Sequence, residues 1–143
     1  MNFLLDENFP ANSIGYLRPM YQGHSFDRVV DGNYQSGIDD LTLFAEAQKQ
    51  GVNVLITGDI RQIMGQDRLD ERAACRAAGI HWLGIPQVLR AKGKERKWAQ
   101  INSLLANLRY AVKHFESASE PTAILLQPGS FKLQAEKDFP QPL

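Results

Sequence analysis

Cysteine is almost missing from this chain, which has a single one, Cys75. One thiol cannot form an intramolecular disulfide or supply a cysteine-rich zinc site, so we interpret Cys75 as a packing residue. The three histidines, His24, His81 and His114, are far apart and show no metal-ligand spacing. We expect each of them to be exposed to solvent or hydrogen-bonded in the core. A single free thiol fits the reducing cytoplasm, which we expect to be the compartment.

Long hydrophobic runs are missing as well. No segment approaches the roughly 20 apolar residues of a transmembrane helix. The N-terminus shows no basic segment followed by an apolar stretch, so we expect neither a secretory signal nor contact with a membrane. Of the 143 residues, 43% are hydrophobic, enough for the core of one domain. We place this domain at residues 1–136 and a loose, proline-rich tail at 137–143.

The chain also has no net charge, with 16 acidic and 16 basic side chains, yet the two signs are separated along the sequence. Residues 1–60 hold eight acidic and three basic side chains, whereas residues 61–97 hold four acidic and nine basic ones. An acidic half beside a basic segment suits a metal site with a polyanion-binding rim. A solvated helix surface explains the pattern equally well.

Short apolar runs alternate with helix-like segments along the chain. This alternation predicts an α/β fold, a mainly parallel sheet with helices on both faces. A C-terminal hairpin would add an antiparallel edge. We predict strands at 2–5, 23–30, 53–57 and 80–85, helices at 10–20, 40–50, 67–78 and from Trp98 to Phe115, a loop at 31–37, and hairpin strands at 122–126 and 131–135.

Aspartates follow two of the predicted strands. Asp6 comes directly after the apolar run 3–5, and Asp59 follows the β-branched run 52–57. Asp40, or its neighbour Asp39, opens the helix before that second run. If the first and third strands are neighbours, Asp6, Asp40 and Asp59 converge at the carboxyl edge of the sheet, where open α/β sheets bind ligands.

Carboxylates without histidine or cysteine form a hard-oxygen site. Such a site suits Mg²⁺ or Mn²⁺, which can activate a water for the hydrolysis of a phosphodiester. Simpler interpretations remain open: Asp40 as a helix N-cap and Asp6 as a turn residue. Thr57 either holds one of the metal ligands in place or is an ordinary strand threonine.

The apolar residues of the last long helix recur at helical spacing, which predicts one buried face made of Trp98, Ile101, Leu105, Leu108, Val112 and Phe115.

Basic residues crowd the start of this helix. Cations there oppose the helix dipole, so we predict that they contact a polyanion such as RNA or an acidic partner. Arg61 follows the acidic cluster closely and either contacts phosphate or lies on the surface. Acidic residues in the 67–78 helix, Glu71 among them, are interpreted as a solvated face and a capping group. The predicted RNA-binding residues are Arg61, Lys92, Lys94, Arg96 and Lys97.

Three of these segments, residues 3–8, the helix start at 39–40 and residues 54–59, resemble the PIN-like domains in their order and spacing. The run over 55–80 is similar to that of small PIN-like proteins related to VapC toxins. The resemblance covers about residues 3–126. It implies a Rossmann-like three-layer α/β/α sandwich and a ribonuclease that depends on Mg²⁺ or Mn²⁺, often the toxin of a type II toxin–antitoxin pair.

Carried over residue by residue, the resemblance gives the same three ligands. The first family aspartate falls on Asp6 and the second on Asp40, with Asp39 as the alternative. The third, in the Thr-x-Asp motif, falls on Asp59. Two features depart from the family pattern: no further acidic residue is evident between the first two positions, and Gly58 replaces the frequent arginine.

Three function classes are therefore carried forward. The first is the endoribonuclease, with RNA as substrate and with a cognate antitoxin and a second copy of the chain as candidate protein partners. The second is a catalytically degenerate PIN-like module that binds RNA or protein. The third is a receiver- or phosphatase-like domain, for which we would expect an Asp-x-Asp turn or a lysine after a later strand.

Overall fold

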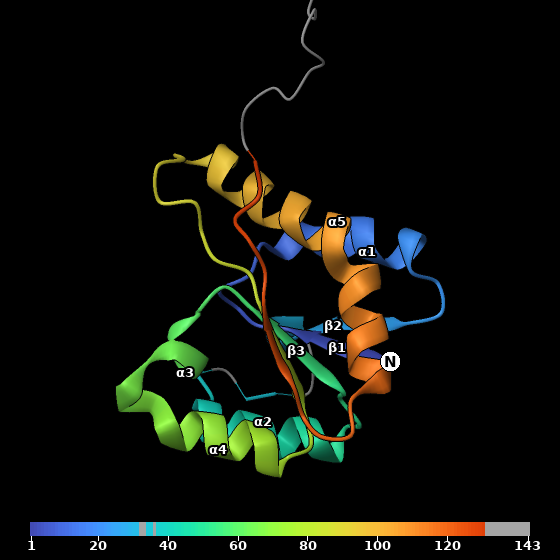
Figure 1. The fold of residues 1–143 in the computed structure, drawn as a ribbon, viewed down its shortest axis with the longest axis vertical. Helices are drawn as coiled ribbons and strands as arrows, with labels where there is room; N and C mark the ends of the chain where they lie inside the picture. Colours follow the sequence, from blue (N-terminus) through green and yellow to red (C-terminus); the bar gives the residue numbers. More distant parts are fainter. Residues whose placement is uncertain (32–33, 36, 131–143) are drawn as a thin grey trace, which may run out of the picture.

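The computed structural model describes residues 1–31, 34–35 and 37–130, in which strands and helices alternate as predicted. Figure 1 shows the arrangement. The strands are β1 (Asn2–Leu5), β2 (Ser25–Arg28), β3 (Val54–Thr57), β4 (His81–Gly84) and β5 (Ala123–Leu125). The α-helices are α1 (Ile14–Met20), α2 (Asp40–Lys49), α3 (Arg61–Met64), α4 (Leu69–Ala77) and α5 (Lys94–Ser117). Three short 3-10 helices are η1 (Ala11–Ser13), η2 (Val29–Asp31) and η3 (Gln66–Arg68).

The five strands form one parallel sheet in the order β2-β1-β3-β4-β5. The predicted adjacency of the first and third strands is therefore confirmed. The chain leaves β1 toward one side of the sheet and returns at β3 on the other, so the strand order reverses between these two strands. In open α/β sheets such a reversal leaves a crevice at the carboxyl ends of the strands.

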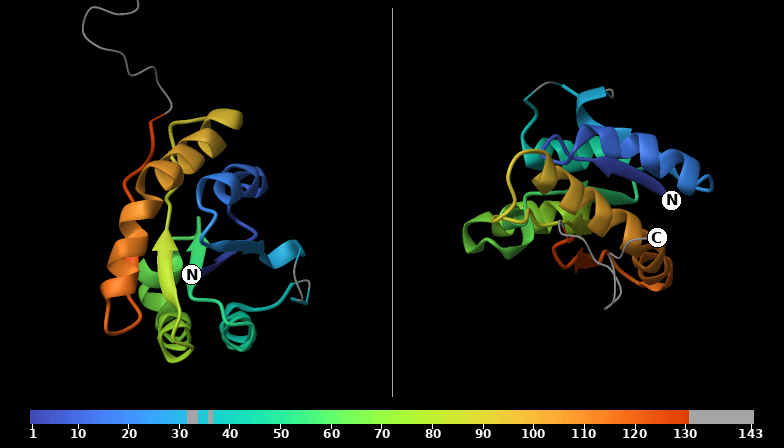
Figure 2. Two further views of the ribbon diagram at one scale, coloured as in Figure 1. Left: turned by 90° about the vertical axis from the view of Figure 1, so that its right-hand side faces the viewer. Right: turned by 90° about the horizontal axis from the view of Figure 1, so that it is seen from above.

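Helices cover both faces of the sheet, which confirms the predicted three-layer α/β/α sandwich. Because alternate residues of a strand point to opposite faces, Phe3 and Leu5 pack in one core with Leu17 and Leu108, from α1 and α5, while Leu4 packs in another. That second core also contains residues of α2 and α4. The side view in Figure 2 shows α1 and α5 on one face and α2 and α4 on the other.

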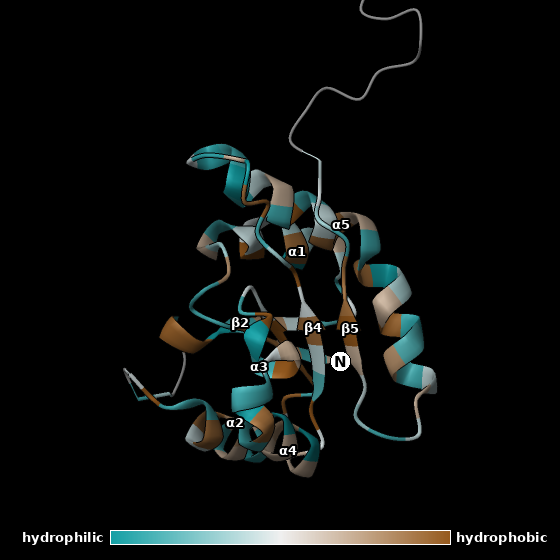
Figure 3. Ribbon diagram, turned by 60° about the vertical axis from the view of Figure 1, so that its left-hand side comes forward, coloured by the Kyte–Doolittle hydropathy of each residue, from teal (hydrophilic) through white to brown (hydrophobic). Residues whose placement is uncertain are grey.

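Helix α5 covers one face of the sheet with an amphipathic surface, and Figure 3 shows it banded in hydrophobic and hydrophilic residues. Ile101, Leu108, Val112 and Phe115 are buried as their spacing predicts. Trp98 is the exception, because 44% of it is exposed. The prediction that Trp98 lies on the buried face of this helix was therefore wrong.

Most predicted boundaries lie within two or three residues of the observed ones. Two segments differ in kind: the predicted helix at 10–20 opens as a 3-10 turn, and residues 60–65, left unassigned by the sequence, contain α3. The first half of the predicted hairpin is β5, which pairs in parallel with β4. Its second strand at 131–135 and the tail at 137–143 lie outside the described residues.

Among the described residues, no helix is both long enough and apolar enough to cross a membrane.

Candidate functional site

Asp6 is held at the carboxyl end of β1 with little freedom. Its backbone N–H donates to the carbonyl of Ile56 at 2.9 Å, which extends the β1–β3 ladder by one residue. The residue is only 6% exposed. Its Oδ2 accepts hydrogen bonds from the Thr57 hydroxyl at 2.7 Å and from Asn8 Nδ2 at 3.3 Å. A buried carboxylate is thus held by one group from the end of β3 and one from the loop that follows β1.

Thr57 connects the two strand-end aspartates. Its hydroxyl is fully buried, donates to Asp6 Oδ2 and accepts the backbone N–H of Asp59 at 2.9 Å. One hydroxyl can donate only one proton and accept from others, so both directions of this group are used. These contacts favour the first interpretation of Thr57, in which it holds a site aspartate in place, over that of an ordinary strand threonine.

Asp59 accepts hydrogen bonds from two arginines. Its Oδ1 lies 3.1 Å from the backbone N of Arg61 and 3.2 Å from Arg61 Nε. Its Oδ2 lies 3.3 Å from Arg68 Nη1. Burial alone would raise the pKa of Asp59, but the hydrogen bonds from Arg61 and the charges of both arginines outweigh it, so the pKa is lowered. Asp59 is therefore ionised and already paired.

Arg68 is the cation at the centre of the acidic cluster, and the sequence reasoning missed it. Besides Asp59, its Nη1 contacts Glu71 Oε2 at 3.2 Å and approaches Asp40 Oδ2 at 3.7 Å. Only 26% of its side chain is exposed. One guanidinium thus lies among carboxylates from three separate segments and offsets part of their negative charge.

Glu71 belongs to this cluster, so its predicted place on a solvated helix face was wrong. Its side chain is 16% exposed and faces Arg68, three residues earlier. The pKa of Glu71 is raised by burial and by the neighbouring Asp40 carboxylate, which together outweigh the effect of Arg68. The spacing of three between Arg68 and Glu71 is typical of a helical ion pair and was the signal that could have revealed both residues.

Asp39 and Asp40 have different roles at the start of α2. Asp39 is the N-cap: its Oδ1 accepts from the backbone N of Thr42 at 3.0 Å and its Oδ2 from the Thr42 hydroxyl at 2.7 Å. Hydrogen bonds from Thr42, the backbone one first, lower the pKa of Asp39. Because Asp39 supplies the cap, the interpretation of Asp40 as the N-cap was wrong.

The three predicted aspartates line one pocket of about 470 Å³. The pocket lies at the carboxyl ends of β1 and β3, the crevice that the strand order creates. In the present arrangement, no group of three or more His, Cys, Asp or Glu side chains among the described residues is poised to hold a metal ion. The lining includes Asp6, Glu7, Asn8, Tyr34, Asp39, Asp40, Asp59, Arg68 and Glu71.

Gly58, the residue that departs from the family pattern, lies at a crowded position. A Cβ atom there would come within 3.2 Å of the Asn8 carbonyl oxygen and 3.0 Å of Gln100 Nε2. Gln100 is buried and donates through the same Nε2 to the carbonyl of Ile85 at 2.9 Å. The close approach of the β1–α1 loop and α5 therefore favours glycine between Thr57 and Asp59.

A second hollow, of about 550 Å³, adjoins the acidic pocket and is lined in part by basic residues. Lys92, Arg96 and Lys97 line it, and Lys94 does not. Arg96 is engaged by the loop before α5, because its Nε donates to the Ala91 carbonyl at 3.2 Å. Within the described ranges no ion pair involves the three lysines.

The two hollows share a wall. Glu7 and Asn8, directly after Asp6, line both the acidic pocket and the basic groove, the name used below for the second hollow. The acidic and basic halves of the sequence thus meet at one edge of the sheet. Arg61, the fifth predicted RNA-binding residue, lies apart from the groove and pairs with Asp59.

Cysteine and histidine take no part in either hollow. Cys75 is buried, its Sγ lies 3.3 Å from the Ile80 carbonyl, and burial raises the pKa of its thiol to about 12. His24 Nδ1 lies 3.0 Å from the terminal amine, and His81 Nδ1 accepts the N–H of Thr122 at 3.0 Å. These contacts match the predicted packing role of Cys75 and the satisfied state of two histidines.

Comparisons of the chain with known protein families, with curated proteins and with solved structures find no match.

The bridge made by Thr57 can be tested with a matched pair of substitutions. Thr57→Val keeps the shape but leaves Asp6 without its shortest hydrogen bond and the N–H of Asp59 without an acceptor. We expect the free energy of unfolding to fall by about 1–3 kcal/mol. Thr57→Ser keeps the hydroxyl and should lose less. Urea unfolding of both variants measures the difference, and equal losses would contradict the bridging role.

The raised pKa of Glu71 predicts a pH-dependent effect of Glu71→Gln. Because the pKa of Glu71 is raised in the folded state, its contribution to stability is present below its ordinary pKa of 4.5 and is lost as pH rises through the raised folded value. Glutamine does not titrate. The variant should therefore gain stability relative to the wild type between pH 3.5 and pH 7.

Urea unfolding at both pH values measures this gain. Glu116→Gln, which changes an exposed glutamate near the end of α5, is the matched control. A difference between wild type and Glu71→Gln that stays constant with pH would contradict the burial of Glu71 beside Asp40.

Proposed function

We propose that this chain is a metal-dependent endoribonuclease that hydrolyses RNA phosphodiester bonds. The observation that carries the proposal is one pocket, at the switch point of a parallel sheet, into which separate segments bring Asp6, Asp40, Asp59 and Glu71. Concentrating carboxylates costs free energy unless a cation neutralises them. The basic groove next to this pocket supplies the complementary charge for a polyanionic substrate.

Carboxylate oxygens match the ligands that Mg²⁺ and Mn²⁺ prefer, and the position of Arg68 among three of these carboxylates supports a site for positive charge. In the proposal Asp6, Asp40 and Asp59 hold the metal, and Glu71 supplies the further acidic group that the sequence did not reveal. The bound metal would activate water and stabilise the charge on the phosphate oxygens. Thr57 keeps Asp6 and the Asp59 backbone in fixed relation.

The substrate is positioned by this chain's own cations. Lys92, Arg96 and Lys97 border the groove that leads to the pocket. They would contact backbone phosphates and place a phosphodiester beside the carboxylates. Lys94 lies on the same turn of α5 and adds to the positive potential. Arg61 holds Asp59 in place and, with most of its side chain exposed, can also reach phosphate.

The cellular role proposed for this nuclease is that of a cytoplasmic toxin in a type II toxin–antitoxin pair. This part rests on the similarity of the strand-end motifs to PIN-like proteins related to VapC toxins. A cognate antitoxin would then be the inhibiting partner, and a second copy of the chain a further partner.

A second candidate function is a catalytically degenerate PIN-like module that binds RNA or protein. The observation that favours it is Arg68, whose guanidinium already satisfies Asp40, Asp59 and Glu71. A cluster completed by the chain's own cation has less need of a metal. The receiver- or phosphatase-like alternative gains no support, since Pro86 follows the apolar run that ends at Ile85 and Leu126 follows β5, and neither is a lysine.

Metal binding should stabilise the fold, and Arg68 should compete with it. A ligand that binds only the native state at 100 times its Kd adds about 2.7 kcal/mol, so millimolar Mn²⁺ should raise the melting temperature. Arg68→Met should lower the melting temperature without metal, because three carboxylates lose their counter-ion. The same variant should show a larger Mn²⁺-induced increase.

Arg76→Met, which removes an exposed arginine of α4 paired with Glu120, is the control for loss of a helix cation. It should leave the Mn²⁺-induced shift as in the wild type. If neither the wild type nor Arg68→Met responds to millimolar Mn²⁺, the non-catalytic module becomes the better description.

Asp59→Asn should abolish RNA cleavage while the fold is retained. The substitution is nearly isosteric and removes one negative charge from the proposed metal ligands, so metal affinity and water activation both fall. The asparagine oxygen can still accept from the backbone of Arg61. Cleavage of a mixed RNA pool with Mn²⁺ measures activity, and circular dichroism measures the fold.

The matched control is Asp27→Asn, which changes an exposed aspartate of β2 that is paired with Arg18 and lies outside the acidic pocket. This variant should cleave RNA as the wild type does. Full activity of Asp59→Asn would show that Asp59 is not a metal ligand.

A further inference from the structure

We propose that the exposed pair Tyr16–Trp98 is a platform on which the bases of a bound RNA strand stack. The inference rests on the proposed function, because it assigns a binding site for the substrate of that function. It stands on an aromatic pair that the fold leaves uncovered, on the cations next to that pair, and on the continuity of the basic groove with the acidic pocket.

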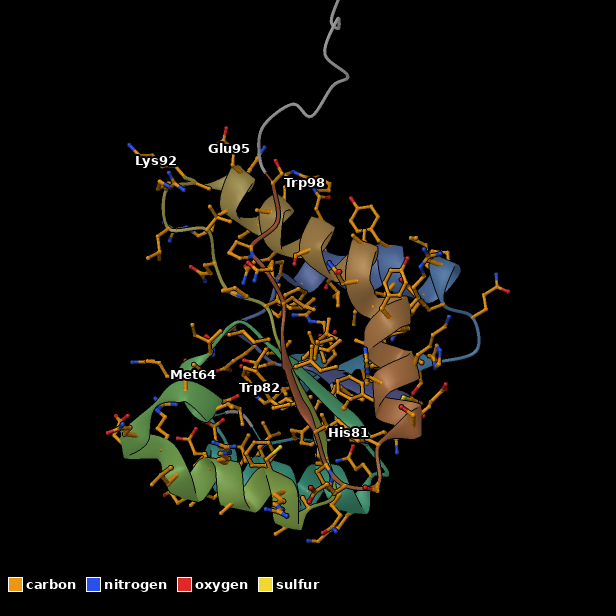
Figure 4. All side chains as sticks on the ribbon, in the orientation of Figure 1. Met64, His81, Trp82, Lys92, Glu95 and Trp98 are labelled. Carbon is orange, nitrogen blue, oxygen red and sulfur yellow. The ribbon has the colours of Figure 1, made fainter. Side chains whose placement is uncertain are left out.

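The two tryptophans of the chain have opposite environments. Trp82 is 2% exposed and donates through Nε1 to Gln62 Oε1 at 3.2 Å. A buried tryptophan usually has such a hydrogen-bond partner. Trp98 is 44% exposed at the start of α5. Figure 4 shows Trp82 enclosed between the layers and Trp98 on the outside, at the same end of α5 as Lys92. The sequence therefore places a large aromatic surface in solvent at this end.

Trp98 is not isolated. Tyr16 of α1, 39% exposed, lies beside it with ring centroids 5.8 Å apart and an angle of 51° between the planes. The two rings come from different helices of the same layer and support each other. A pair fixed in this way presents an aromatic surface that loses little conformational freedom when a flat partner stacks on it.

The cations around the pair determine the kind of flat partner. Lys94 is one helical turn before Trp98 and so lies on the same face of α5. Lys97 directly precedes Trp98 and lines the basic groove. Aromatic side chains next to a positively charged groove are typical of single-strand nucleic-acid binding, with stacked bases and neutralised phosphates. A duplex keeps its base faces inside and cannot use the rings in this way.

The groove then leads toward the proposed catalytic pocket. It is bounded by Lys92, Arg96 and Lys97 on one side and by Glu7 and Asn8 on the other, and the latter two also line the acidic pocket. A strand anchored by its bases at Tyr16 and Trp98 would pass its phosphates along the lysines. Its next phosphodiesters would reach the carboxylates at the ends of β1 and β3.

The test is a binding titration that does not require cleavage. The full-length protein, kept in EDTA, is titrated with a 12-nucleotide oligouridine, with a 12-base-pair RNA duplex and with inorganic polyphosphate. Tryptophan fluorescence reports stacking, and because Trp82 is buried, a change in signal comes from Trp98. We expect oligouridine to quench the fluorescence, and we expect polyphosphate to bind without quenching and the duplex to bind more weakly than oligouridine.

Substitutions separate stacking from charge. Base stacking on an aromatic residue is worth about 1–3 kcal/mol, so Trp98→Ala should weaken oligouridine binding by about tenfold, while Trp98→Phe should retain most of the affinity. Tyr110→Ala, which removes another exposed aromatic of α5 outside the groove, is the control and should bind as the wild type does. Affinities of these variants are measured by fluorescence anisotropy with labelled oligouridine.

Unchanged oligouridine affinity in Trp98→Ala, equal binding of the duplex, or no RNA binding at all would overturn the proposal. The first of these results would assign the pair to a protein partner instead. The proposal for Trp98 and the proposal for Asp59 can be refuted independently, because one is tested by RNA binding and the other by RNA cleavage. An active ribonuclease with an indifferent Trp98 refutes only the stacking platform, whereas quenching by oligouridine in an inactive protein refutes only the nuclease.

Discussion

The sheet forces carboxylates together at the ends of β1 and β3, and the need to neutralise them governs the rest of the site. The register that pairs Leu5 with Ile56 brings Asp6 beside Thr57, whose hydroxyl joins Asp6 to the backbone of Asp59. Arg68 then supplies the positive charge that Asp59, Asp40 and Glu71 require. Without such a cation, the mutual repulsion of these groups would oppose the close approach of β3, α2 and α4.

This electrostatic requirement links fold and proposed function. In the structure the pocket holds the chain's own arginine, Arg68, beside its carboxylates. In the proposed function a divalent metal would take the place of this arginine, and only the metal-bound state would hydrolyse RNA next to the basic groove. The acidic and basic residues that are separated along the sequence thus lie next to each other at one edge of the sheet.

Sequence pattern alone predicted the parallel α/β/α architecture and the placement of Asp6, Asp40 and Asp59 around one pocket, because strand ends of a parallel sheet share one edge. It did not reveal Arg68 and Glu71, because the sequence shows the spacing of charged residues along a helix but not which face of the helix lines the pocket. The same pattern placed Trp98 in the core, because periodicity cannot show which turns of α5 remain exposed at its end. The tight packing around Gly58 likewise depends on the β1–α1 loop and on α5, which only the fold brings together.

The proposed function requires that the carboxylates around Arg68 bind a metal ion and that the metal displaces the arginine. A crystal structure of the protein soaked in Mn²⁺, with anomalous scattering to identify the ion, tests it most directly. The account predicts an Mn²⁺ ion bound by Asp6 and Asp59, with carboxylate oxygens at about 2 Å and the Arg68 guanidinium moved away. Well-ordered crystals in which Arg68 keeps its contacts to Asp59 and Glu71, with no anomalous peak in the pocket at millimolar Mn²⁺, would contradict it.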